Sequence, residues 1–469
     1  MAASMLAEWI KSQQLRGPAA KGATTFHRNL EEALDVRRRG HGLYALKKSL
    51  WRNGAAVDFN SSDALSLGAS GRLRAEFNKE LERYPDLPPG PTSSRIMDGN
   101  YEYLEMVEEE IARFHEAETA LFLGSGYDAN VAVFCAIPRP GDAILYDELI
   151  HASAHDGIQQ SQVACRIPFH HNDVEAFRDA LESIVHSQPL IRQGKRCVIV
   201  AVESVYSMDG DICPLQDLID AVKEIMPVGS TQFYVDEAHA TGVLGPRGGG
   251  LVHELGVEKE VAIRLHTFGK ALASTGAVVL GSKTVKSALI NFARGIIFTT
   301  APGFPTVAAV RSAYTLMATG QTMQAQETIQ VVVRYFFEAI ASNPTWQEAE
   351  NHGILSVPLS YNWKQKPFVS HIVPICTRPQ YSYWLVFHLA FRKLSTYPLE
   401  YPVIPKGQSR VRLTFHSHNT KEQIDELISA ICNWAQEMME IELGQGEINR
   451  IPKAARQVYS LMNSDNMIE

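Results

Sequence analysis

Short apolar runs that alternate with longer stretches of helical periodicity constrain the fold of this chain more than any other feature. Four of the runs, at residues 142–146, 196–203, 231–236 and 276–281, read as buried strands. Strands without polar alternation are typical of parallel sheets that helices cover on both faces. The pattern therefore predicts an α/β fold with a mostly parallel sheet.

The 469 residues are long enough for more than one lobe. Helices are expected over 304–342, and strands near 369–376 and 409–415 precede a helix near 420–438. We expect four parts, which are an N-terminal helical segment and arm (1–75), a large α/β domain (76–310), a smaller C-terminal α+β domain (311–445) and a polar tail (446–469), with residues 441–469 poorly ordered.

Two N-terminal segments stand out within these parts. Residues 27–50 read as an amphipathic helix whose apolar face carries Leu30, Leu34, Val36 and Leu43. Residues 84–100 contain four prolines and read as a long loop. Loops of this length are often functional.

Composition narrows the class of protein. Apolar residues make up 45% of the chain and charged residues 20%, and the net charge is −8, which gives no reason to expect a nucleic-acid partner. The six cysteines are scattered without a CxxC pair, which suits a reducing compartment and predicts no metal site. Because no apolar run reaches about 18 residues, we expect no membrane span and a cytoplasmic location.

Two residues near strand ends suggest the chemistry. Asp236 closes the strand 231–236, and a carboxylate there can be a metal ligand, a helix cap or the partner of a heterocyclic nitrogen. Lys270 follows between two buried segments, where an unpaired ammonium is costly. Enzymes that use pyridoxal 5'-phosphate (PLP) need both, because the carboxylate keeps the pyridine nitrogen protonated and the lysine holds the cofactor as a Schiff base.

Two further segments can complete such a site. Gly124-Ser125-Gly126-Tyr127 lies at a strand-to-helix turn, where backbone N–H groups can bind a phosphate, although a simple turn is the alternative. His151 follows another strand, and its imidazole can stack on a pyridine ring. The alternative for His151 is a hydrogen-bonded loop histidine.

Five segments in order resemble the α-oxoamine synthases, the family that contains 8-amino-7-oxononanoate synthase, the member most similar in appearance. They are Ser125-Gly126-Tyr127-Asp128-Ala129-Asn130, His151-Ala152-Ser153, the stretch from Glu203 to Asp211, the stretch from Asp236 to Gly245, and Thr267-Phe268-Gly269-Lys270. The resemblance runs from about residue 30 to about residue 440. It implies a fold type I PLP-dependent transferase, with a seven-stranded, mostly parallel sheet in a large domain and a smaller α+β domain.

The resemblance also implies roles. Lys270 would carry PLP, Asp236 would pair with the pyridine nitrogen and His151 would stack on the ring. Ser207 and His239 would lie near the phenolic oxygen. The remaining positions are Ser125, Gly126, Tyr127 and Thr267 at the phosphate, Thr299 and Thr300 at the phosphate of a second subunit in a homodimer, and Arg412 at the carboxylate of the amino acid.

The departures from the family lie where substrate should bind. The usual Asn-Asp-Tyr-Leu-Gly is replaced by Ser62-Asp63-Ala64-Leu65-Ser66, and Gly42-Leu43-Tyr44 is followed by Ala45 instead of arginine. The Pro-Pro-Thr-Val-Pro segment becomes Tyr401-Pro402-Val403-Ile404-Pro405. The cofactor chemistry is thus expected to be intact, while the amino acid, the acyl chain and its carrier stay open.

The leading hypothesis is decarboxylative condensation of a small L-amino acid, of the alanine or glycine type, with an acyl thioester of coenzyme A or a carrier protein. The product would be an α-amino ketone in biotin or specialised-metabolite biosynthesis. One alternative is a PLP-dependent aminotransferase. Another is a catalytically silent subunit. The presence of Lys270, Asp236 and His151 in one chain argues against this alternative.

Overall fold

The computed structural model describes residues 6, 9–16, 22–46, 52, 54–227, 229–444 and 451–464, which fall into two compact units. The sheet unit comprises Ser61–Val331 and His416–His418. The terminal unit comprises the described residues of Met1–Asn60, Val332–Phe415 and Asn419–Glu469. These limits differ from the domains predicted from the sequence, because both ends of the chain group with the smaller domain.

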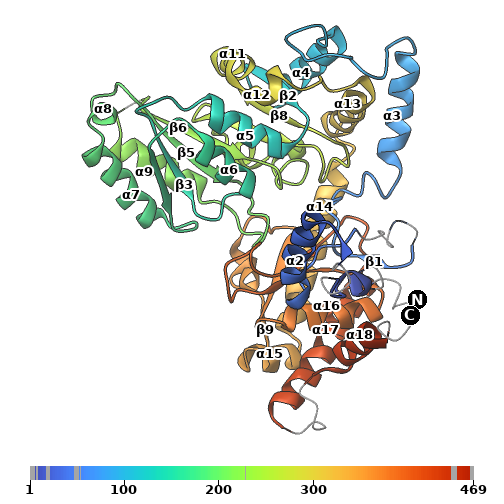
Figure 1. Ribbon diagram of the computed structural model, residues 1–469. Helices are drawn as coiled ribbons and strands as arrows, with labels where there is room; N and C mark the ends of the chain where they lie inside the picture. Colours follow the sequence, from blue (N-terminus) through green and yellow to red (C-terminus); the bar gives the residue numbers. More distant parts are fainter. Residues whose placement is uncertain are drawn as a thin grey trace. The chain divides into compact units, whose positions relative to one another are not determined.

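The sheet unit is built on a seven-stranded sheet with the strand order β2-β8-β7-β6-β5-β3-β4 (Figure 1). β8 runs antiparallel to β2 and β7, and every other neighbouring pair is parallel. The strands are β2 (Thr119–Leu123), β3 (Ala143–Asp147), β4 (Cys165–Phe169), β5 (Val198–Glu203), β6 (Thr231–Asp236), β7 (Val261–Thr267) and β8 (Ala277–Gly281). The prediction of a mostly parallel sheet is confirmed.

Apolar side chains bury both faces of this sheet. Ile199 and Ala201 join the core that α5 and α6 cover on one face, and the alternating residues Val198 and Val200 are buried on the other. The helices of the unit are α3 (Arg72–Arg83), α4 (Glu102–Phe114), α5 (Gly126–Ala136), α6 (Ala152–Gln160), α7 (Val174–Ser187), α8 (Pro189–Arg192), α9 (Leu215–Ile225), α10 (Leu251–Leu255), α11 (Lys283–Phe292), α12 (Arg294–Ile297) and α13 (Phe304–Ala318). The continuous apolar runs of the sequence are explained by this double burial.

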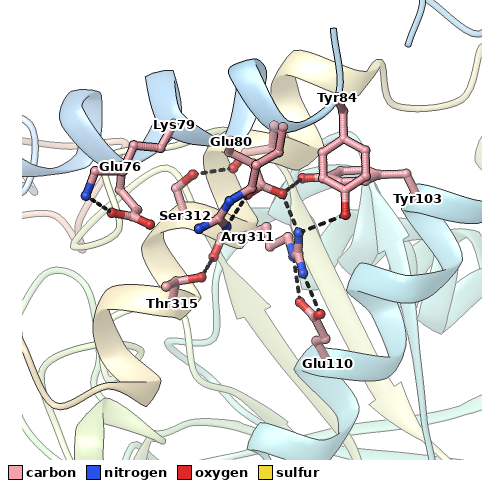
Figure 2. A network of polar contacts seen from close by, with 11 residues as sticks. Glu76, Lys79, Glu80, Tyr84, Tyr103, Glu110, Arg311, Ser312 and Thr315 are labelled. Carbon is pink, nitrogen blue, oxygen red and sulfur yellow. Dashed lines mark hydrogen bonds and ion pairs between the residues drawn. The ribbon is translucent and has the colours of Figure 1, made fainter. Parts of the chain in front are cut away.

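A polar network joins α3, α4 and α13 (Figure 2). The Arg311 guanidinium binds Glu110 through two hydrogen bonds of 2.8 and 2.9 Å and also pairs with Glu80. The Tyr103 hydroxyl donates to Glu80 at 2.7 Å. Burial alone would raise the pKa of Glu80, but the hydrogen bonds from Tyr103 and Arg311 hold it below its ordinary value. The network therefore ties α3 to the rest of the sheet unit.

The terminal unit contains a four-stranded sheet of order β12-β13-β10-β9 and a parallel pair of β1 with β11. Its strands are β1 (Val57–Asp58), β9 (Leu355–Ser356), β10 (Ile372–Thr377), β11 (Leu394–Ser395), β12 (Tyr397–Leu399) and β13 (Arg410–Thr414). Its helices are α2 (Thr25–Arg39), α15 (Pro344–Asn351), α16 (Tyr381–Phe391), α17 (Lys421–Glu442) and α18 (Lys453–Ser464), and α14 (Met323–Ala341) leads into it from the sheet unit. The strands expected near 369–376 and 409–415 and the helix near 420–438 are confirmed as β10, β13 and α17.

Two expectations for the ends of the chain are wrong. The expected helix over 27–50 ends at Arg39, and the side chains buried on α2 are Asp35 and Arg38, which form an ion pair, whereas Leu30 is 50% exposed. The tail expected to be poorly ordered contains α18, whose Ala455 and Val458 are fully buried against α16. A short helix is stabilised mainly by packing against other elements, here α16, which a local sequence pattern does not reveal.

The described ranges lack two features, a membrane-spanning helix and a metal-binding cluster. No helix among them is long and apolar enough to cross a membrane. No group of three or more histidine, cysteine, aspartate or glutamate side chains among them is arranged to hold a metal ion.

Candidate active site

Several of the predicted residues lie at one edge of the seven-stranded sheet. Asp236 and Thr267 are the last residues of the adjacent parallel strands β6 and β7. β2 also ends at this edge, because Leu123 and Thr267 both pair with Ala277 of the antiparallel strand β8. In open α/β sheets the carboxyl edge of the strands is where ligands bind.

Asp236 is buried and held in a fixed orientation. Its Oδ2 accepts a hydrogen bond from Asn130 of α5 at 3.0 Å, and its Oδ1 accepts one from the Ala238 backbone N–H at 2.9 Å. The Tyr234 hydroxyl in turn donates to the Asn130 side-chain oxygen at 2.6 Å. A carboxylate held in this way can face a protonated ring nitrogen without losing side-chain entropy.

Lys270 lies in the turn between β7 and β8. The turn is closed by hydrogen bonds from Phe268 N–H to Gly276 O at 3.0 Å and from Ser274 N–H to Phe268 O at 2.8 Å. Lys270 itself is half-buried. Its position at the end of β7, beside the end of β6, fits a lysine that reaches the same ligand as Asp236.

The charges of Asp236 and Lys270 act on both His151 and Glu203. His151 caps α6 and keeps an exposed surface. Burial of the rest of its ring lowers the pKa of His151. The Lys270 ammonium lowers this pKa further, whereas the Asp236 carboxylate raises it. Glu203 ends β5 opposite Asp236, and burial together with the Asp236 charge raises its pKa well above the ordinary value. Glu203 Oε1 is buried and has no hydrogen-bond partner within the described part of the chain.

The first turn of α5 forms a cradle for an anion. Gly126 lies so close to β7 that a Cβ atom there would come within 2.4 Å of Thr267 Cγ2. The Ser125 hydroxyl accepts a hydrogen bond from Asp128 N–H at 3.0 Å and caps the helix. The same hydroxyl donates to the carboxylate of Asp128, the acidic side chain of this turn, at 2.8 Å. The N–H groups of Gly126 and Tyr127 begin the helix and point toward its N-terminal side, where a phosphate is stabilised.

The other predicted residues are distributed as follows. Ser207 lies in a hairpin closed by the bridge between Val205 and Ile212, and His239 is buried in the turn after β6. Thr299 and Thr300 follow α12 and line a pocket of about 90 Å³ together with Gly124, Asp128 and Arg95. Arg412 belongs to the terminal unit, on β13, where burial lowers its pKa.

The chemistry of these residues fits PLP. The fixed carboxylate of Asp236 matches the ring nitrogen of PLP, and the lysine matches its aldehyde. The imidazole with an exposed surface matches the face of the ring. The helix N-terminus, which has no room for a side chain at Gly126, matches the phosphate. The sequence reasoning gave no role to Asn130 or Glu203. The place of Asn130 one helical turn after Gly126 could have indicated that it lies near the site. Glu203 could have been identified because it ends a predicted strand, as Asp236 does.

Comparison with known proteins agrees with this geometry. The family model for aminotransferase class I and II matches residues 92–431. The chain is 53% identical to aminoacyl transferase sphA of Aspergillus fumigatus over 98% of this chain and 97% of the relative. It is 41% identical to 8-amino-7-oxononanoate synthase of Emericella nidulans, over 87% of this chain and 96% of that protein.

Solved structures show the same fold. A serine palmitoyltransferase of Sphingomonas wittichii superposes with a TM-score of 0.67 at 22% identity, over 81% of this chain and 87% of that one. The 8-amino-7-oxononanoate synthase of Francisella tularensis superposes with a TM-score of 0.60 at 25% identity, over 81% and 98%. The curated relatives carry the names of acyl transferases and synthases, so the alternative of an aminotransferase has no support. The chain belongs to the α-oxoamine synthases of the class I and II aminotransferase family, which are PLP-dependent acyltransferases of fold type I.

Proposed function

We propose that this enzyme condenses a small L-amino acid, of the alanine or glycine type, with an acyl thioester and releases CO2, the free thiol and an α-amino ketone. The observation that carries the proposal is the meeting of Asp236, Lys270 and His151 at the carboxyl edge of one sheet, in a chain whose relatives are acyl transferases. The higher identity to the aminoacyl transferase than to the 8-amino-7-oxononanoate synthase supports a product outside biotin synthesis.

Each residue has a defined task in this reaction. When bound, PLP withdraws electrons from the α-carbon of the amino acid. Asp236 holds the proton on the ring nitrogen, and Lys270 Nζ removes and returns the α-proton. His151 covers the ring and orients the thioester carbonyl. The Gly126 and Tyr127 N–H groups and the Thr267 hydroxyl would bind the phosphate, and the Ser125 hydroxyl would join them by turning from the Asp128 carboxylate; Arg412 would bind the substrate carboxylate.

The assembly and location belong to the same proposal. Ser207 and His239 would lie near the phenolic oxygen, and Thr299 and Thr300 would reach the phosphate of a second copy. Large exposed side chains at Ile96, Met97 and Phe298 near this segment support burial in a homodimer. The acyl carrier would be coenzyme A or a carrier protein, and the enzyme would act in the cytoplasm.

The test is to offer purified holoenzyme single amino acids and acyl thioesters and to measure free thiol and CO2 together. Equal amounts of both are expected with alanine or glycine, and Lys270→Ala, with an unchanged circular-dichroism spectrum, should release neither. Release of thiol without CO2 would show simple hydrolysis. Release of neither product by the wild type with any amino acid would overturn the proposal.

A further inference from the structure

A charged cluster lies beside the site but outside the residues with an assigned role. Its centre is His171, on the turn after β4, whose Nδ1 lies 2.9 and 3.1 Å from the two carboxylate oxygens of Asp147. Its Nε2 lies 2.7 Å from Asp211 Oδ2. Asn172 adds a second contact to each acid, from its N–H to Asp147 at 3.0 Å and from its side-chain amide to Asp211 at 2.7 Å. We call these four residues the His171 cluster.

The geometry fixes the charge of His171. Carboxylates accept hydrogen bonds, and a neutral imidazole can donate from only one of its nitrogens. Burial would lower the pKa of His171, but the hydrogen bonds to Asp147 and Asp211 raise it to about 10. The ring is thus a cation with two N–H donors at neutral pH, which suits a fixed link rather than a proton shuttle.

The two acids belong to two turns that carry predicted site residues. Asp147 ends β3, and its carboxylate also accepts from Leu149 N–H at 2.9 Å, inside the turn that leads to His151 at the start of α6. Asp211 closes the hairpin that carries Ser207, because its carbonyl accepts from Tyr206 N–H at 3.0 Å. The Tyr206 ring meets the His171 ring edge-on, with 4.4 Å between their centroids.

We propose that His171 is a positioning residue that clamps the turn of His151 to the hairpin of Ser207, and so sets where these two side chains meet PLP. The proposal rests on the proposed function for the roles of His151 and Ser207. His171 itself contacts neither residue through the hydrogen bonds of the cluster, so its effect passes through Asp147 and Asp211.

The neighbouring histidine supplies a matched control. His170 has an 80% exposed side chain and a single contact of 3.2 Å to Glu148, which is also exposed. Holoenzymes with His171→Gln and His170→Gln are compared with the wild type. The three readouts are the pH titration of the visible absorption of the bound cofactor, the affinity of the cofactor-free protein for PLP, and kcat against KM for the amino acid.

For His171→Gln we expect kcat to fall about tenfold while KM changes less than about threefold, because a misplaced group acts mainly in the transition state. The midpoint of the absorption titration should move by about half a pH unit or more, since Ser207 would lie near the phenolic oxygen. The His170→Gln protein should match the wild type in all three readouts.

A His171→Gln protein that is less stable but keeps the wild-type absorption titration and kcat would show a purely structural role and overturn the proposal. If His171→Gln does not fold, Asp211→Asn, which removes one charge and keeps the shape, must show the same spectral shift. If the wild type releases no thiol, only the proposed function is contradicted. The absorption titration and the PLP affinity still test the role of His171.

Discussion

Two carboxyl groups with different surroundings lie on neighbouring strands of the site. Glu203 and Asp236 end neighbouring strands in register. Asp236 accepts hydrogen bonds from the Asn130 side chain and from the Ala238 backbone N–H. Glu203 has a pKa raised well above the ordinary value by burial and by the charge of Asp236. The two carboxyl groups therefore differ in their hydrogen-bond partners, since Glu203 Oε1 has none within the described part of the chain.

Amide substitutions should separate the two carboxyl groups. Glu203→Gln keeps the shape of a side chain whose pKa is raised by burial, so we expect PLP affinity and kcat within about threefold of the wild type. Asp236→Asn removes the charge at the ring nitrogen, and the loss of a charge-assisted hydrogen bond of about 1.5–3 kcal/mol should lower kcat roughly 10- to 150-fold. Steady-state kinetics and PLP titration of both variants measure this. Equal losses in the two variants would contradict the assignment.

The sequence was informative for residues that directly follow strands. Asp236 and Lys270 were singled out because a carboxylate at a strand end and a lysine between buried segments are costly without a partner, whereas His151 received its role from the family resemblance. The hydrogen bond from Asn130 to Asp236, 106 positions away, was not predicted, because the place of Asn130 one turn after Gly126 puts it near the site but does not identify Asp236 as its partner. The same holds for His171, whose partners at 147 and 211 are joined only by the folding of three separate turns.

At the scale of elements, the two ends of the chain form one apolar cluster on α16. Leu6, Trp9 and Ile10 from the N-terminal segment and Ala455 and Val458 from α18 are buried there together with Phe387. The Trp9 and Phe387 rings lie 5.3 Å apart. Strands were predictable from their own apolar runs, whereas α18 was not, because its few small apolar residues become a core only against α16.

A charge on the buried face of α18 should destabilise this cluster. Val458→Asp places a carboxylate at a fully buried position in an apolar cluster, and we expect a loss of about 3 kcal/mol in the free energy of unfolding. Gln457→Asp, on the exposed face of the same helix, should cost less than about 0.5 kcal/mol. Urea unfolding followed by tryptophan fluorescence compares the two. Similar midpoints for both variants would mean that α18 adds nothing to the stability of the terminal unit.

At the scale of the whole molecule, histidines make stability depend on pH in two opposite ways. Burial lowers the pKa values of His41, His115, His151, His266 and His388. In the unfolded chain they take up protons below about pH 6.5, so their effect on stability changes only on that acid side. His171 is shifted the other way, to a pKa of about 10. Its stabilising contribution is complete below about pH 6.5 and is lost as the pH rises toward 10.

The window between pH 6.5 and 8.5 should therefore report on His171. Unfolded thiols, whose pKa is about 8.5, also titrate in the upper part of this window, and they do so in every variant. Through His171 the folded chain holds up to one more proton than the unfolded chain, which adds a fall in the free energy of unfolding of up to about 1.4 kcal/mol per pH unit. Urea midpoints measured at pH 6.5, 7.5 and 8.5 should fall more steeply for the wild type and for His170→Gln than for His171→Gln. Equal slopes in the three proteins would mean that His171 is not charged between Asp147 and Asp211, and that the link between the two turns is an ordinary hydrogen bond.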